Sequence, residues 1–220
     1  MILKSLLAVL LGYLLGSFPS AYVASRIVKG RDIRQVDGGN MGTLNTLREI
    51  GLVPGLLVLI TDVGKGVLAV LVAKWLGASE VVIFISGFAA VVGHSWPVFL
   101  GFKGGRGGAT AVGIYFGLVP LAAAISFGVL LLVVLLTSNA RLGLAANFTV
   151  QPFIIWAFGG SLALIIYALV VPLLLLGVRM LIDDHDKLSD SYVRKNLIID
   201  HGYTWWQSRR KITSESDKKE

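Results

Sequence analysis

The stretch GHSWPVFLGFKGGRGGAT, residues 93–110, decides the fold class of this chain. It lies between two long apolar runs and holds five glycines within residues 101–108, together with His94, Lys103 and Arg106. Glycines let the backbone turn with positive φ and let amide groups approach a ligand closely. A run of such amides followed by a helix start binds anions. The stretch therefore predicts a phosphate-binding loop at one face of a membrane.

Composition places the rest of the chain in that membrane. Of the 220 residues, 55% are apolar and 15% are charged, and the mean hydropathy is +0.77. Soluble domains carry about 25% charged residues, and apolar runs of about 20 residues, the length that crosses a bilayer, recur along this chain. We expect an all-α, polytopic transmembrane helical bundle of about five to seven spans.

The net charge of +7 does not indicate a nucleic-acid partner. The cations lie beside the apolar runs, where they set orientation and contact anionic lipid headgroups. The chain has no cysteine, which excludes a disulfide, a thiolate nucleophile and a cysteine metal site. We expect membrane lipids as partners and a multi-pass location in the membrane.

Residues 3–25 are interpreted as an uncleaved first span, because no small-x-small cleavage site follows them. Its small and turn-forming residues Gly16, Ser17, Pro19 and Ser20 fit either helix packing or a wall of a site. The loop 29–51 is the densest basic cluster beside a span, so the positive-inside rule places it in the cytoplasm and the N-terminus outside.

The second and third spans are predicted at residues 52–73 and 81–93, which makes the loop 97–108 cytoplasmic. The run 109–136 is too long for one untilted span, and apolar segments 144–158 and 161–182 follow it. Basic residues beyond the last segment favour a cytoplasmic tail, which requires an odd number of spans. Either the run 109–136 forms two short segments or the segments within 144–182 do not cross twice.

The chain thus divides into a transmembrane domain, residues 1–182, with cytoplasmic loops 29–51 and 97–108, and a cytoplasmic or interfacial tail, residues 183–220. The tail begins with DDHD, residues 183–186. A hard-cation site needs several oxygens that converge rigidly, so we interpret this run as an exposed acidic helix end. We expect no metal and no cofactor.

Two further polar segments accompany the glycine-rich stretch. DGGNMGTLNTLREIG, residues 37–51, is rich in turn-forming residues and predicts a helix start at Thr43 or Asn45. It is either a flexible connector or a second polar patch that faces the first. In the second span, Asp62 and Lys65 stand at i and i+3 and share a helix face. They form either a self-neutralising pair within the membrane or part of the same polar cavity as Lys103.

The glycine-rich stretch lacks the GxxxxGK[ST] spacing of a Walker loop, which argues against nucleotide hydrolysis. A tight re-entrant turn without a ligand is an alternative. A transporter with a site at the membrane midplane is another, since broken helices beside charges suit one. The chain shows no internal repeat, and its polar residues gather at one face, which disfavours the transporter.

Taken in order, these motifs resemble those of the bacterial acyl-phosphate:glycerol-3-phosphate acyltransferases of the PlsY type. Residues 93–110 resemble the family's GHxFPVFLxFKGGKGVAT, and residues 37–48 resemble its GSGNxGATNxxR. The family's DxxKG matches residues 62–66, and GSFPSAYV at 16–23 resembles its GSIPxxYL. The resemblance covers residues 12–113, about half of the chain, and is specific because four motifs occur in order.

The resemblance implies a bacterial inner-membrane enzyme that moves an acyl group from an acyl phosphate to the 1-hydroxyl of glycerol 3-phosphate. The products are lysophosphatidic acid, for phospholipid synthesis, and phosphate. The acyl phosphate is already activated, so positioning and charge stabilisation can carry the reaction without a covalent nucleophile.

Carried onto this chain, the resemblance suggests roles for each motif. His94 orients a phosphate or accepts the hydroxyl proton, and Lys103 joins it as a catalytic candidate. The remaining candidates are substrate-binding residues: Asn40, Asn45, Arg48, Asp62, Lys65, Gly104, Gly105, Arg106, Gly107, Gly108, Thr110, Arg194 and Asn196.

The chain departs from the family pattern at several positions. Gly38 replaces the serine of GSGN, and Arg106 and Gly108 replace a lysine and a valine. The family's C-terminal HRxNIxRLxxGxE has only a trace here, VRKNLIID at 193–200. These departures support a second hypothesis, a non-catalytic or re-purposed relative that binds phosphate-bearing lipids or membrane partners.

Overall fold

The computed structural model describes residues 2–36 and 39–183. The fold is all-α, as expected, and no described residue lies in a strand. The first half comprises α1 (Ile2–Gly16), α2 (Ser20–Lys29), the 3₁₀ turn η1 (Ile33–Gln35), α3 (Thr43–Glu49), α4 (Leu52–Trp75) and α5 (Glu80–Ser95). The second half comprises the turn η3 (Val98–Leu100), α6 (Gly108–Leu118), α7 (Pro120–Thr137), α8 (Ala140–Ala157) and α9 (Leu162–Asp183).

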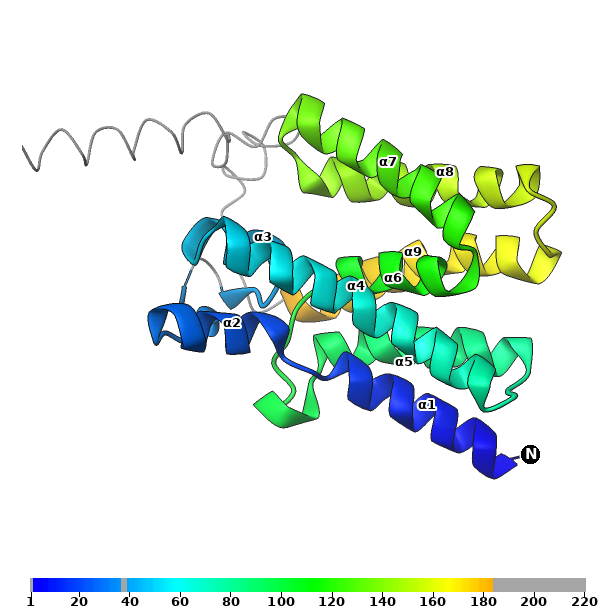
Figure 1. The fold of residues 1–220 in the computed structure, drawn as a ribbon, viewed down its shortest axis with the longest axis horizontal. Coiled ribbons are helices and arrows are strands. Elements are labelled where there is room, and N and C mark those ends of the chain that lie inside the picture. Colours follow the sequence, from blue (N-terminus) through cyan, green and yellow to red (C-terminus); the bar gives the residue numbers. More distant parts are fainter. Residues whose placement is uncertain (1, 37–38, 184–220) are drawn as a thin grey trace, which may run out of the picture.

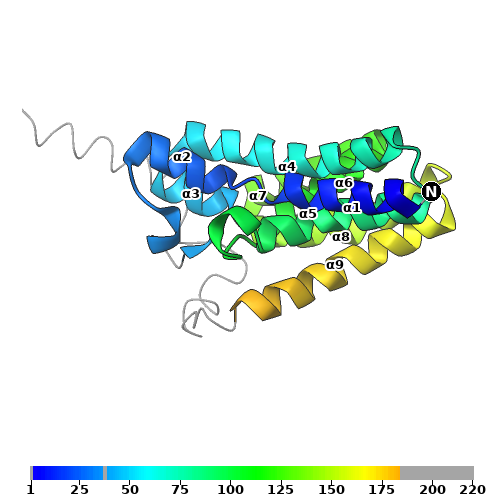
Figure 2. The ribbon, with the colours of Figure 1, turned by 90° about the horizontal axis from the view of Figure 1, so that it is seen from below.

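The long helices lie side by side, and the short helices α2 and α3 sit at the end of the bundle away from the N-terminus (Figures 1 and 2). The turn 96–107 lies at this same end (Figure 1). Within the bundle α1 packs against α5 and α4, α4 packs against α6, and α8 packs between α7 and α9. The two loops predicted to be cytoplasmic therefore lie at one end of the molecule.

Four helical stretches are long and apolar enough to cross a membrane, by length and composition and among the described residues: Ile2–Lys29, Leu52–Trp75, Glu80–Leu100 and Pro120–Thr137. Gly108–Leu118 and Leu162–Val178 are shorter apolar helices. The predicted odd span count and the predicted orientation of the termini stay predictions.

Two prolines break the apolar runs. The predicted first span, residues 3–25, is helical on both sides of a break at residues 17–19, and Pro19 precedes the first residue of α2. The run 109–136 forms two helices, α6 and α7, which is the first of the two alternatives above. Val119 has φ −141° and ψ 72° and precedes Pro120, the first residue of α7. A proline disfavours helical dihedrals in the preceding residue and suits the first helical position.

Glycines allow the helices to approach at backbone distance. A Cβ atom on Gly66 of α4 would collide with the Thr110 carbonyl oxygen of α6, and one on Gly113 of α6 would collide with the Val63 carbonyl oxygen of α4. Between α1 and α5, a Cβ on Gly16 would collide with Ala90. Small residues at such contacts are typical of helix packing in membranes. These contacts bring α4 close to α6 and α1 close to α5.

Candidate active site

Four buried polar side chains from three helices meet at the break in the first span. Asp62 of α4 accepts a hydrogen bond of 2.6 Å from the Ser20 hydroxyl of α2. Its Oδ1 also lies 2.8 Å from Lys65 Nζ and 3.6 Å from Nδ1 of His94, on α5. Asp62 is 1% exposed, and the other three side chains are 5% to 7% exposed. We call Ser20, Asp62, Lys65 and His94 the buried cluster.

The break between α1 and α2 supplies one more partner to this cluster. Lys65 Nζ donates a hydrogen bond of 3.2 Å to the main-chain oxygen of Phe18, which lies between the two helices. Helix ends leave main-chain oxygens without helical partners, and a buried ammonium is costly unless it is paired and hydrogen-bonded. The expected i, i+3 pair of Asp62 and Lys65 is confirmed as an ion pair, and the helix break completes it.

The cluster retains unused hydrogen-bonding atoms. Among the residues that the structure describes, neither Asp62 Oδ2 nor His94 Nδ1 has a hydrogen-bond partner. A small cavity of about 10 Å³ adjoins the cluster, and Pro19, Met41 and Pro97 line it with Lys65 and His94. This volume suits about one water molecule.

The glycine-rich loop lies directly against His94. Gly105 donates its main-chain N–H to the His94 carbonyl oxygen at 3.1 Å, and a Cβ on Gly105 would collide with Nε2 of His94. Gly107 has φ 74°, and α6 begins at the next residue, Gly108. The predicted glycine turn that leads into a helix start is therefore confirmed, and the structure places it beside the histidine.

The two cations of that loop lie farther out. Lys103 is exposed and Arg106 is half-buried. Lys103 is not among the residues that line the cavity beside Lys65, so a cavity common to Lys65 and Lys103 stays a prediction. Thr110 is fully buried in α6 at the contact with Gly66, with its carbonyl oxygen facing that glycine.

The first loop is held together by Asn45. Its Nδ2 donates to the carbonyl oxygens of Val36, at 3.2 Å, and Asn40, at 2.9 Å. α3 begins at Thr43, one of the two expected positions, and Arg48 is half-buried in its last turn. The Asn45 amide nitrogen thus orders the loop.

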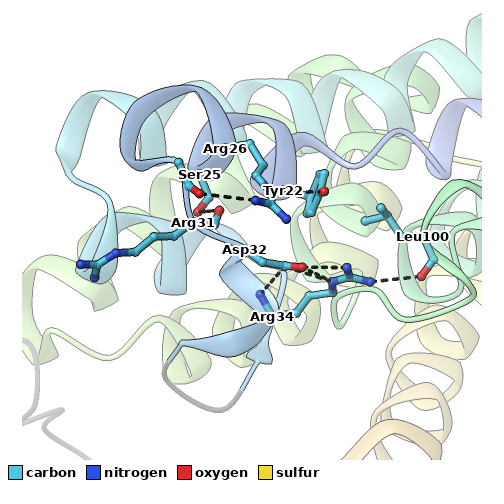
Figure 3. Close-up of polar contacts among 8 residues, drawn as sticks. Tyr22, Ser25, Arg26, Arg31, Asp32, Arg34 and Leu100 are labelled. Atoms are coloured by element: carbon cyan, nitrogen blue, oxygen red, sulfur yellow. Dashed lines mark hydrogen bonds and ion pairs between the residues drawn. The ribbon is translucent and has the colours of Figure 1, made fainter.

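This first loop meets the glycine-rich loop, as the interpretation of two facing polar patches requires. Met41 lines the cavity, and its carbonyl oxygen lies against Gly105. Arg34 reaches across to donate a hydrogen bond of 3.3 Å to the Leu100 carbonyl oxygen (Figure 3). Sequence reasoning missed Met41 and Arg34, because nothing in their local sequence distinguishes them from ordinary loop residues.

Arg34 is itself fixed by Asp32. The guanidinium donates to both carboxylate oxygens, with a shortest distance of 2.7 Å (Figure 3). These hydrogen bonds, assisted by the Arg34 main-chain N–H, hold the pKa of Asp32 below its usual value.

The Tyr22 ring lies 5.3 Å from the Arg26 guanidinium and 5.4 Å from that of Arg34. α2 and the two loops therefore form one connected polar end.

The chain is similar to known proteins over most of its length. A family model described as "Glycerol-3-phosphate acyltransferase" matches residues 6–186. The chain belongs to this family. "Glycerol-3-phosphate acyltransferase 1" of Dehalococcoides mccartyi is 40% identical over 201 residues, which cover 89% of this chain and 96% of that protein. "Glycerol-3-phosphate acyltransferase" of a Synechococcus species is 42% identical over 176 residues, 80% of this chain and 88% of that protein.

Two solved structures of the glycerol-3-phosphate acyltransferase family share the fold. Both are of PlsY, an integral membrane glycerol 3-phosphate acyltransferase. The glycerol 3-phosphate form has a TM-score of 0.72 and 34% identity, and covers 80% of this chain and 88% of its own. The lysophosphatidic acid form has a TM-score of 0.68 and 32% identity, and covers 79% and 87%. The chain is thus a family member over most of its length.

Some positions of the glycerol-3-phosphate acyltransferase motifs fall outside the described residues. These are Gly38, at the serine position of the first motif, and Arg194 and Asn196, in the C-terminal trace. Most of the DDHD run lies there too. Among the described residues, no group of three or more His, Asp or Glu side chains could hold a metal ion.

Proposed function

We propose that this chain transfers the acyl group of an acyl phosphate to the 1-hydroxyl of sn-glycerol 3-phosphate in a bacterial cell membrane. The product is lysophosphatidic acid, and phosphate leaves. Homology carries this proposal: relatives named glycerol-3-phosphate acyltransferase match nearly the whole chain. The solved relatives are named for forms with glycerol 3-phosphate and with lysophosphatidic acid, the acceptor and the product of this reaction.

In the reaction the acceptor hydroxyl oxygen forms a bond to the acyl carbon, and the bond from that carbon to the phosphate oxygen breaks. The hydroxyl proton needs an acceptor. His94 suits this role, because Asp62 lies beside its Nδ1 and its Nε2 faces the glycine-rich loop. A carboxylate on one ring nitrogen orients an imidazole and leaves the other nitrogen for proton transfer.

The phosphate groups need positive charge and N–H donors. We assign the acyl phosphate to Lys103, Arg106 and the main-chain amides of residues 104–108, which lead into the start of α6. Thr110 follows in the first turn of that helix. We assign glycerol 3-phosphate to Asn40, Asn45 and Arg48 of the first loop, with Lys65 across the cavity. Arg194 and Asn196 are assigned to the same site by the family motif.

The test is acyl transfer by purified protein, with palmitoyl phosphate and labelled glycerol 3-phosphate. Lys103→Met should lower the rate at least 100-fold, since a lost donor to developing charge costs about that much. Its melting temperature should not change, because Lys103 is exposed. Lys103→Arg serves as the matched variant that keeps the charge. Equal rates in wild type and Lys103→Met would remove Lys103 from the site.

A second candidate is a re-purposed family member that binds phosphate-bearing lipids without turnover. Gly38 favours it, because the family motif has a serine hydroxyl at this position and glycine offers none. Folded wild-type protein that binds glycerol 3-phosphate and yields no lysophosphatidic acid would establish this candidate in place of the first.

A further inference from the structure

Arg34 uses three guanidinium nitrogens at once, and they serve two different loops. Nε and Nη2 donate to the oxygens of the Asp32 carboxylate, and Nη1 donates to the Leu100 carbonyl oxygen at 3.3 Å (Figure 3). Asp32 is 7% exposed and also accepts the main-chain N–H of Arg34 at 3.0 Å. The planar fork of a guanidinium makes these directed contacts together, whereas a lysine ammonium is a single point charge. Arg34 thus joins loop 29–51 to the turn that precedes the glycines.

Leu100 is held at this contact by its side chain as well as by its carbonyl oxygen. The side chain packs against the apolar cluster that contains Ile33, the fully buried residue before Arg34. Leu100 is the last residue of η3, and its N–H donates to the Pro97 carbonyl oxygen at 3.1 Å. Two consecutive residues of loop 29–51 therefore fix the end of η3.

The backbone turns sharply directly after Leu100. Gly101 has φ 63° and Phe102 has φ 62°. A positive φ is unfavourable for a residue with a side chain, so Phe102 holds this conformation only while its surroundings impose it. The Leu100 carbonyl and the Gly101 amide share one rigid peptide plane. A hydrogen bond to that carbonyl therefore restrains the start of the turn, and the Phe102 N–H completes it by donating to Pro97 at 3.0 Å.

Lys103 follows this turn and lies between two fixed points of the main chain. The turn at residues 100–102 precedes it, and Gly105 is hydrogen-bonded to the His94 carbonyl oxygen two residues later. The Lys103 side chain is exposed, so packing does not set its direction. The conformation of the turn therefore decides where its ammonium group can reach.

We propose that Arg34 is a positioning residue for acyl transfer, which holds the turn at residues 100–102 so that Lys103 faces the phosphate of the acyl donor. The proposal rests on the acyl-transfer function above, in which Lys103 binds that phosphate. Arg34 itself makes no contact with substrate. Loss of its guanidinium lets the turn relax from the left-handed conformation, and this weakens the use of the acyl phosphate without changing the binding of glycerol 3-phosphate.

Hydrogen–deuterium exchange of the peptide that spans residues 97–103, in detergent and without substrate, tests the hold on the turn. In Arg34→Met this peptide should exchange about tenfold faster than in wild type, because the turn opens more often. Arg26→Met is the matched control. Arg26 lies over the same Tyr22 ring, but its hydrogen bonds go to Tyr22 and Gly30. Exchange at residues 97–103 should equal that of wild type in this control, and equal exchange in Arg34→Met would refute the hold.

Steady-state kinetics with palmitoyl phosphate and glycerol 3-phosphate test the consequence for the reaction. In Arg34→Met the kcat/KM for palmitoyl phosphate should fall about tenfold, while the KM for glycerol 3-phosphate stays unchanged. Arg34→Lys should be equally impaired, because an ammonium group cannot make the three contacts. In a Lys103→Met background, Arg34→Met should lower the rate by less than about twofold, because a residue that acts through another adds no separate effect.

The opposite results overturn the positioning role. Full activity of Arg34→Lys, or a raised KM for glycerol 3-phosphate in Arg34→Met, would make Arg34 a charged ligand of the substrate. An undiminished loss in the Lys103→Met background would show that Arg34 does not act through Lys103. If Arg34→Met fails to fold, Arg34→Lys, which keeps the charge, carries the same comparisons. Absence of product from wild type with every donor would instead refute the acyl-transfer function, and the exchange measurement would still decide whether Arg34 holds the turn.

Discussion

Asp62 connects more of the site than any other single side chain. Its carboxylate accepts the hydroxyl hydrogen of Ser20, pairs with Lys65, and lies beside His94. The ion pair with Lys65 depends on the carboxylate being charged. Removal of that charge would leave the Lys65 ammonium buried beside neutral oxygen atoms, among them the Phe18 carbonyl oxygen.

We therefore expect Asp62→Asn to destabilise the protein by about 3 to 5 kcal/mol, the usual cost of breaking a buried ion pair from one side, and to abolish acyl transfer. The double variant Asp62→Leu with Lys65→Met should recover most of the stability, because no charge remains buried, and should stay inactive. Thermal unfolding in detergent and the transfer assay measure the two properties. An active Asp62→Asn protein would remove Asp62 and its orientation of His94 from the mechanism.

At this scale the sequence predicts contacts that are local. The i, i+3 spacing predicts the Asp62–Lys65 pair, and the run of glycines predicts a turn that leads into a helix start. The Ser20–Asp62 hydrogen bond joins residues 42 positions apart, and its existence depends on how α2 turns away from α1. Helix periodicity does not give that angle. The sequence therefore leaves two interpretations of Ser20 open, helix packing and a role in the site.

The helices are held together by backbone contacts at glycines, which explains the short separation of α4 and α6. We expect Gly113→Ala to destabilise the protein, because its methyl group would collide with the Val63 carbonyl oxygen. Overpacking of this kind costs about 1 to 3 kcal/mol. Gly177→Ala is the control, since a Cβ there meets nothing within 4 Å. Equal melting temperatures for the two variants would contradict the close helix contact.

Helix boundaries are predicted less well than helix existence. Each apolar run of the sequence corresponds to a helix, yet the first run is two helices and the run 109–136 is also two. Pro120 marks the second break from sequence alone. Pro19 lies near the first break, but a proline in a membrane helix can also be tolerated when neighbours satisfy the freed groups. The Phe18 carbonyl oxygen at the first break accepts a hydrogen bond from Lys65, which is distant in the sequence. Local sequence does not predict such a contact.

At the scale of the whole molecule, both polar loops lie at one end of the bundle (Figure 1). The basic residues of loop 29–51 predict that this end faces the cytoplasm. The natural chain has no cysteine, so single cysteines can report its orientation. Arg31 lies in the first loop and Ser79 lies in the turn between α4 and α5; both are exposed.

We expect a membrane-impermeant maleimide added to intact cells to label Ser79→Cys and not Arg31→Cys. In permeabilised cells both should react, which controls for accessibility. The physical reason is that one traverse of α4 separates the two positions. The opposite pattern would reverse the orientation, and equal labelling in intact cells would show that α4 does not separate two aqueous sides.

Gly64 and Gly66, two of the three glycines of α4, lie on different faces of the helix and have different surroundings. A Cβ on Gly66 would collide with the Thr110 carbonyl oxygen, while a Cβ on Gly64 would meet no atom within 4 Å. Residues two apart on a helix do not face each other, so the two effects are separable. A substitution at Gly64 therefore leaves the contact of α4 with α6 in place, and a substitution at Gly66 does not.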